Sequence, residues 1–147
     1  MTVYTRSIGA PLLPAGPYVL LVDDEAETIG PLGELVRHAG FTSVAARCVA
    51  DAVACCFHRK PALLVTDLVM PGHDGRALAR RVRRRHPAVP ILLVTGQDLD
   101  LPDWRIPPDL FHGVFSKPLD FERFLKTVER LMPPSAPKGA PTPRARP

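Results

Sequence analysis

The sequence predicts an α/β protein, in which a parallel sheet is covered by helices on both faces. Continuous apolar runs, such as residues 18–22 and 91–94, are typical of strands that are buried on both sides. Segments with helical periodicity separate these runs, and strands that alternate with helices pair in parallel through right-handed crossovers. The 147 residues allow one domain, and the 46% apolar content is ordinary for a globular chain.

Each element follows from its local pattern. Strands are expected at residues 18–22, 41–46, 62–66, 90–95 and 113–115. Helices are expected at residues 26–39, 49–58, 74–86 and 120–132. The first helix contains Pro31, which predicts a kink or a late helix start, and it is followed by Gly40 at the position of a helix-ending glycine. Five strands in this order suit a flavodoxin-like doubly wound sheet with strand order 2-1-3-4-5 and helices on both faces.

Basic residues and prolines gather at the ends of the chain. Residues 18–132 hold 15 basic and 15 acidic residues, so the formal charge of +4 comes from Arg6, Lys138, Arg144 and Arg146. A neutral body is not typical of a nucleic-acid-binding fold, and no nucleic acid partner is expected. Six of the 18 prolines fall in the last 15 residues. We therefore expect a flexible lead at 1–16, a domain at 17–132 and a disordered Pro-rich basic tail at 133–147.

The apolar runs and cysteines exclude other classes. No apolar run approaches the roughly 20 residues that span a bilayer, and three prolines interrupt the N-terminal apolar patch. A cytoplasmic location and no membrane partner are therefore expected. Cys48, Cys55 and Cys56 have no metal-ligand spacing, so they are interpreted as small buried apolar residues.

Polar side chains stand where the expected strands end. Asp23 and Asp24 follow the first strand, Asp67 the third, Thr95 closes the fourth and Lys117 follows the fifth. Ligand sites of such sheets lie at the carboxyl ends of the strands. Carboxylates this close repel one another unless a cation joins them, and Mg²⁺ prefers oxygen ligands where phosphate is handled. With a lysine and a hydroxyl to bind phosphoryl oxygens, the set predicts a site that accepts a phosphoryl group on a carboxylate.

Four motifs carry a family resemblance. VLLVDDE (19–25), VTDLVMPGHDG (65–75), ILLVTG (91–96) and FSKP (115–118) resemble the response-regulator receiver domain of two-component signal transduction. The similarity covers roughly residues 17–132, with the motifs in the family's order and each at the end of an expected strand. Any one of these motifs is short, and the specificity comes from finding all of them together.

The resemblance implies a role for each site residue. Asp67 matches the phosphoacceptor, Thr95 the switch hydroxyl and Lys117 the lysine that binds the phosphoryl group. The implied Mg²⁺ ligands are Asp23, Asp24, Asp67 and the backbone carbonyl of Val69, with Asp24 a more direct ligand than Asp23. Pro118 matches a proline that often follows a cis peptide bond in the family. Gly72 and Gly75 match the turn after the acceptor, where glycine permits backbone conformations that other residues resist.

The resemblance also implies partners. A sensor histidine kinase or a histidine phosphotransfer protein would donate the phosphoryl group, and a downstream protein target would read the result. Only a short tail follows the last expected helix, so a stand-alone receiver or a fragment of a hybrid kinase is expected. Such a chain is a signalling switch that catalyses only its own phosphorylation and dephosphorylation.

Two positions depart from the family pattern. An aromatic residue commonly lies three positions before the lysine, whereas this chain has Val114 there and Phe115 next to it. Residues 97–108 contain three prolines and little helical periodicity, so the fourth helix of the family is expected to be short, displaced or absent. Trp104 and Ile106 in this segment fit either a core contact or a partner surface.

Two alternative functions stay open. The chain could be a pseudo-receiver, an interaction module that is not phosphorylated, or a hydrolase on a similar sheet with an acidic nucleophile. The arginines of residues 76–85 form a dense basic helix, which is interpreted as a solvated face or as a docking surface for an acidic partner. Binding to a phosphate backbone is a weaker reading of the same helix, because it lacks aromatic stacking residues.

Overall fold

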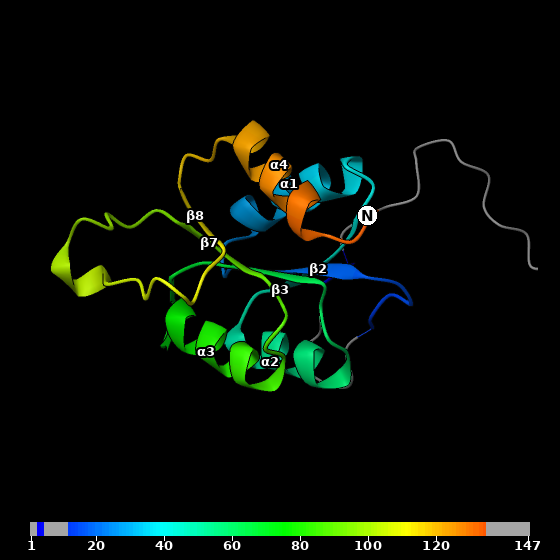
Figure 1. Cartoon of the computed structure of the whole chain (residues 1–147), viewed down its shortest axis with the longest axis horizontal. Coiled ribbons are helices and arrows are strands. Elements are labelled where there is room, and N and C mark those ends of the chain that lie inside the picture. Colours follow the sequence, from blue (N-terminus) through cyan, green and yellow to red (C-terminus); the bar gives the residue numbers. More distant parts are fainter. Residues whose placement is uncertain (1–2, 5–11, 135–147) are drawn as a thin grey trace, which may run out of the picture.

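A parallel sheet forms the middle layer of the molecule, and helices cover both of its faces (Figure 1). The structure, a computed structural model, describes residues 3–4 and 12–134. The six strands are β1 (Val3–Tyr4), β2 (Tyr18–Val22), β3 (Thr42–Ala46), β4 (Leu63–Thr66), β7 (Ile91–Thr95) and β8 (Gly113–Ser116). Their order is β1-β3-β2-β4-β7-β8. Without β1 this is the predicted order 2-1-3-4-5, which confirms the fold class.

The first strand was not expected. Val3 pairs in parallel with Val44 and Tyr4 with Ala45, so β1 adds a sixth strand at the edge of the sheet. The expected flexible lead therefore includes two paired residues. The other residues before Leu12, and most of the expected tail, lie outside the part of the chain that the structure describes.

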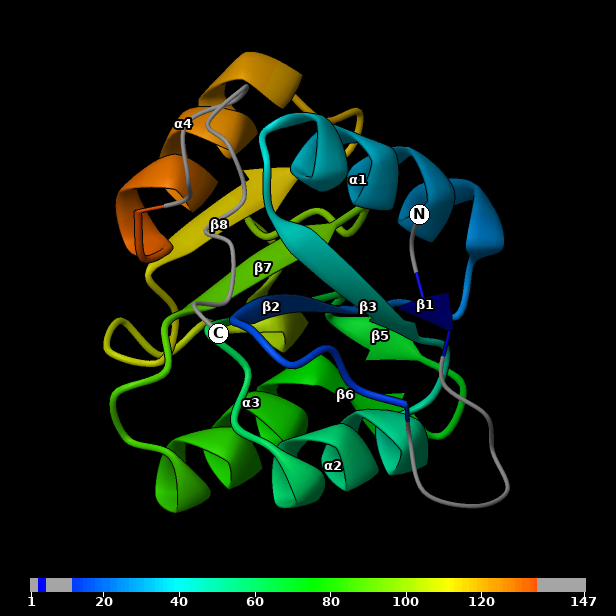
Figure 2. The ribbon, with the colours of Figure 1, turned by 90° about the vertical axis from the view of Figure 1, so that its right-hand side faces the viewer.

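The four α-helices of the described residues divide equally between the two faces of the sheet. Helices α1 (Ala26–His38) and α4 (Phe121–Leu131) cover one face, and α2 (Val49–His58) and α3 (Gly75–Arg85) cover the other (Figures 1 and 2). Helix α1 begins at Ala26 and continues through Pro31, so a late start is not observed. Gly40 has a φ of 94° and its N–H donates to the carbonyl of Arg37, which agrees with its predicted position after the helix.

Each face of the sheet has its own hydrophobic core. Because strand side chains alternate, Leu20 packs with residues of α2 and α3, whereas its neighbour Leu21 packs with residues of α1 and α4. Cys55 and Cys56 are buried in the first core. Burial raises the pKa of the Cys55 thiol to about 12 and that of Cys56 to about 11, so both remain protonated thiols at neutral pH.

The segment after β7 lacks a regular α-helix, as predicted. It contains only the 3-10 helix η1 (Pro102–Trp104) and loops outward beyond α3 in Figure 1. The guanidinium of Arg76 lies 5.7 Å from the ring centroid of Trp104 and donates to the carbonyl of Arg105 over 2.9 Å. Trp104 and Ile106 are both half-buried, so each has buried surface for a core contact and exposed surface for a partner.

A short hairpin follows β4. Strands β5 (Val69–Met70) and β6 (His73–Asp74) pair in antiparallel, where the sequence predicted only a turn. Gly72 in this turn has a φ of 71°, a conformation that favours glycine.

The helices of the described residues are too short or too polar to span a membrane.

Candidate functional site

Three carboxylates meet at the carboxyl ends of β2 and β4. Val22 is the register partner of Thr66, so the residues that follow, Asp23 and Asp67, emerge side by side. Oxygens of Asp23, Asp24 and Asp67 lie within 4.8 Å of one another. The group is the one cluster of acidic, histidine or cysteine side chains with this geometry in the described part of the chain.

Lys117 reaches the same cluster from the end of β8. Its Nζ lies 3.0 Å from Oδ2 of Asp23 and 3.6 Å from Oδ2 of Asp67. Its backbone N–H donates to the carbonyl of Thr95, and the Lys117–Pro118 peptide bond is cis, as the resemblance implied. The ammonium therefore lies within 4 Å of two of the three carboxylates.

The electrostatics of the site favour an added cation. Burial raises the pKa of Asp23, although the N–H of Glu25 and the ammonium of Lys117 both favour its ionised form. Burial opposes the charge of Lys117, but the hydrogen bond and charge of Asp23, helped by Asp67 and Glu25, raise the pKa of Lys117 overall. The lysine stays charged, and the three clustered carboxyl groups offer oxygen ligands that suit a divalent cation.

The two oxygens of Asp67 have different surroundings. Oδ1 accepts a hydrogen bond from the N–H of Leu68 over 2.7 Å, whereas Oδ2 is the oxygen nearer to Lys117. Although Asp67 is only 8% exposed, it lines a cavity of about 690 Å³. This volume lies within the range of small-ligand sites, and it is large enough to hold a phosphoryl group beside Asp67.

The cavity also brings in residues from two loops. Val69 belongs to the hairpin after Asp67, and Gln97 belongs to the loop after β7. Asp24, Glu25 and Lys117 complete the charged part of the wall. The structure thus brings the predicted metal and catalytic side chains together, with one exception.

That exception is Thr95. It is fully buried at the end of β7, and the adjoining residues, rather than Thr95 itself, line the cavity. Its Oγ1 accepts a hydrogen bond from the N–H of Gln97 over 3.1 Å. The hydroxyl therefore holds the loop after β7, and a contact with a group on Asp67 would require this loop to move.

Gly75 is important for a reason that the sequence did not reveal. A Cβ on Gly75 would lie 2.0 Å from the backbone carbonyl oxygen of Asp67. The N–H of Gly75 donates to the carbonyl of Leu68 over 2.7 Å. Among the described glycines, positive φ is confined to Gly40 and Gly72, so the conformational interpretation of Gly75 was wrong. Only glycine lets α3 begin this close to the acceptor loop.

Phe115, next to the position where the family commonly has an aromatic residue, points to the face of the sheet that α1 and α4 cover. Phe115 is buried against Phe124 of α4, with an edge-to-face arrangement and a centroid distance of 5.4 Å. Because side chains alternate along β8, Val114 points to the face of the sheet opposite to that of Phe115. Phe115 therefore does not replace the missing aromatic residue at position 114.

Comparisons with known proteins agree with this geometry. Residues 19–129 match the response regulator receiver domain family. The response regulator receiver protein Anae109_2439 of Anaeromyxobacter sp. is 36% identical over 111 residues, which cover 75% of this chain and 43% of that protein. The DNA-binding transcriptional regulator NtrC of Escherichia coli is 30% identical over 115 residues, covering 78% of this chain and 24% of NtrC. The chain therefore spans less than half the length of these relatives.

Solved structures share the fold. The signal receiver domain of an HD domain-containing protein from Pseudomonas fluorescens superposes with a TM-score of 0.71 and 27% identity, covering 78% of this chain and 93% of that one. The response regulator TrrA of Thermotoga maritima, solved in complex with Mg(2+)-BeF, gives a TM-score of 0.68 at 24% identity, covering 80% of this chain and all of that one. With the family match over residues 19–129, these findings show that the chain belongs to the response regulator receiver domain family.

Proposed function

We propose that this chain is a phosphorelay receiver that accepts a phosphoryl group on Asp67 in the presence of Mg²⁺. One observation carries the proposal: Asp23, Asp24, Asp67 and Lys117 come from three strand ends and cluster beside one cavity, which Asp24, Asp67 and Lys117 line. A structural ion pair does not need three clustered carboxylates. Transfer of a phosphoryl group to a carboxylate does need positive charge, from a metal ion and a lysine, to neutralise the transferred oxygens.

The donor set fits Mg²⁺. Asp23, Asp24 and Asp67 offer oxygens close enough to share one ion, and the backbone carbonyl of Val69 is the proposed fourth ligand. When bound, the metal supplies positive charge that stabilises the oxygens of the group being transferred. The three clustered carboxyl groups are the reason to expect this ion.

The phosphoryl donor is proposed to be a phosphohistidine of a sensor histidine kinase or a histidine phosphotransfer protein. Oδ2 of Asp67 attacks the phosphorus, a P–O bond forms, and the P–N bond breaks with its electron pair left on the imidazole. The N–H of Leu68 holds Oδ1 and so orients the carboxylate. Lys117, which lies 3.6 Å from Oδ2, stabilises the charge on the transferred oxygens.

Phosphorylation is proposed to shift the chain between two states. The new oxygens on Asp67 would attract the hydroxyl of Thr95, which releases Gln97 and moves the loop after β7. The surface of β7, β8 and α4 would then change its affinity for a downstream protein target. Because position 114 is a valine, this change does not involve an aromatic side chain there.

Incubation with acetyl phosphate and Mg²⁺ tests the proposal. Mass spectrometry is expected to show a gain of one phosphoryl group, which is absent in Asp67→Asn and unchanged in Asp109→Asn, an exposed aspartate away from the site. No gain in the wild-type chain would favour the pseudo-receiver alternative. Continuous hydrolysis of small phosphate esters would favour the hydrolase.

The lifetime of the phosphoryl group gives a second prediction. Val69 is 38% exposed and lines the cavity two residues beyond Asp67, where an apolar side chain hinders the approach of water. We expect the purified phosphoprotein to persist well beyond seconds, and Val69→Asn to shorten its half-life severalfold. Leu101→Asn, an equally polar change at an exposed site outside the cavity, is the control. Equal half-lives for the Val69 variant and the wild type would contradict this role.

A further inference from the structure

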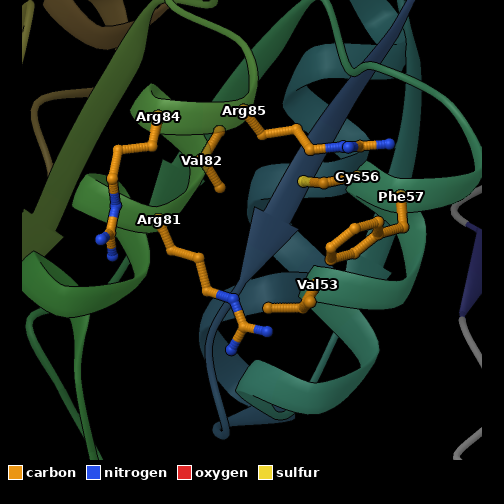
Figure 3. Close-up of a pocket in the computed structure, with 7 residues that line it drawn as sticks. All are labelled: Val53, Cys56, Phe57, Arg81, Val82, Arg84 and Arg85. Carbon is orange, nitrogen blue, oxygen red and sulfur yellow. The ribbon is translucent and has the colours of Figure 1, made fainter.

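A second hollow lies between α2 and α3, away from the phosphoacceptor cavity. It has a volume of about 390 Å³ and is lined by Val53, Cys56, Phe57, Arg81, Val82, Arg84 and Arg85 (Figure 3). These residues come from the later turns of both helices, and no residue lines both hollows. Helix α3 starts beside Asp67 and rises about 1.5 Å per residue, so Arg85 lies roughly 15 Å along the helix from Gly75. We call this hollow the α2–α3 groove.

The floor of the α2–α3 groove is apolar. Val53, Cys56 and Val82 provide it, and Phe57 stands at its side with 54% of its surface exposed. A large aromatic side chain left this open at a groove is a typical anchor point for a partner.

The rim of the groove is cationic. Figure 3 shows Arg81 extending from α3 toward Val53, and Arg85 extending across toward the end of α2. The guanidinium of Arg85 lies 4.5 Å from the ring centroid of Phe57. Within residues 3–4 and 12–134, no ion pair joins Arg81, Arg84 or Arg85 to a carboxylate.

This charge is a local excess in a neutral body. Helix α3 carries six arginines and no acidic residue, and the acidic residue of α2 lies in its first turn, away from the groove. Cations in the last turn stabilise a helix through its dipole, which accounts for part of the pattern. It does not account for an open Phe57 and an apolar floor between the same arginines.

The residues of this sequence outside the described part are not acidic and do not complement the groove. The residues outside the described part contain four basic residues and no aspartate or glutamate. A second copy that presented the same face would bring arginines against arginines. We therefore look for the charge complement on another molecule.

We propose that the α2–α3 groove binds an acidic amphipathic helix of a protein partner. Carboxylates of this helix pair with Arg81 and Arg85, and one of its apolar side chains enters between Val53 and Phe57. A nucleic acid fits less well, because Phe57 is the one aromatic residue lining the groove and Arg85 already covers a face of its ring. The interaction is independent of the phosphoryl chemistry proposed above.

Fluorescence anisotropy tests the proposal directly. The probe is a labelled helical peptide with leucines at positions i, i+3, i+4 and i+7 and glutamates elsewhere, titrated with the full chain without Mg²⁺ or phosphodonor. We expect binding that weakens with added salt and that falls at least about tenfold in Arg81→Glu/Arg85→Glu, since two charge-assisted contacts are lost. Phe57→Ser, which changes no charge, is expected to weaken binding as well.

The matched control reverses two charges on the opposite face. Lys126→Glu/Arg130→Glu has the same net charge as the groove variant, and both residues are exposed on α4. It is expected to bind the peptide like the wild type, and circular dichroism verifies that both variants are folded. No binding by the wild type, equal loss in both double variants, or equal binding of a peptide with the same residues in scrambled order would overturn the proposal. Binding of an RNA oligonucleotide or of phosphatidylglycerol vesicles that depends on Arg81 and Arg85, with no binding of the peptide, would also overturn it.

Discussion

Replacing Lys117 with alanine is expected to slow phosphorylation of Asp67 by acetyl phosphate on the order of 10²–10³-fold. The ammonium of Lys117 is the one cationic group that the structure places within 4 Å of Asp67 among the described residues. Without it, negative charge on the transferred oxygens would lose a fixed stabilising partner in a partly buried cavity. The rate is measured by mass spectrometry over a time course at fixed Mg²⁺.

Lys126→Ala provides the control for this experiment. Lys126 is exposed on α4 and pairs with Glu122 rather than with the site, so its removal changes the net charge equally but should leave the rate unchanged. Thermal unfolding of both variants separates a catalytic effect from a structural one, because Lys117 also pairs with the buried Asp23. A rate within about tenfold of the wild type for folded Lys117→Ala would show that the lysine is not part of the transfer step.

Gly75→Ala is expected to disturb both stability and phosphorylation. Its Cβ would lie 2.0 Å from the carbonyl oxygen of Asp67, and because that atom belongs to the backbone, either α3 or the acceptor loop must move. We expect a loss of about 2–3 kcal/mol in the free energy of unfolding, which corresponds to a melting temperature about 10 °C lower. Phosphorylation should slow as well, because the displaced loop carries the nucleophile.

Two other glycines serve as graded controls. Gly72 has a φ of 71° and open space around the Cβ position, so Gly72→Ala should cost about 1 kcal/mol through backbone strain alone. Gly16 has open space and no positive φ, so Gly16→Ala should change stability very little. A melting temperature for Gly75→Ala that equals that of Gly72→Ala would contradict the close approach.

The loop after β7, which is proposed to move on phosphorylation, lacks a regular α-helix in this chain. In this chain the loop carries the 3-10 helix η1 and is held at one end by the hydroxyl of Thr95 and farther along by Arg76. Arg76 is also paired with Asp74 of the hairpin after the acceptor, and its charge and hydrogen bonds outweigh burial and lower the pKa of Asp74. The loop is thereby joined to the acceptor side of the sheet through α3.

The sequence by itself predicted the order of the five main strands and the side chains that meet at their carboxyl ends. Apolar runs such as residues 18–22 and 91–94 identify strands buried on both faces, and parallel pairing brings the residues after these strands to one edge. The meeting of Asp23, Asp67 and Lys117 follows from that topology alone. Hydrophobic periodicity shows which faces of a strand or helix are buried, and this information was sufficient to predict which strand ends form the site.

Only the tertiary structure decided the distances between segments that are remote in sequence. The contact between Gly75 and the carbonyl of Asp67, the loop-holding hydrogen bond of Thr95, and the pairing of β1 with β3 depend on how finished elements pack. The α2–α3 groove arises in the same way, because a helical pattern does not show that Phe57 is left open between two helices. Local propensity does not contain this information, because these contacts form only when the helices and strands are brought together.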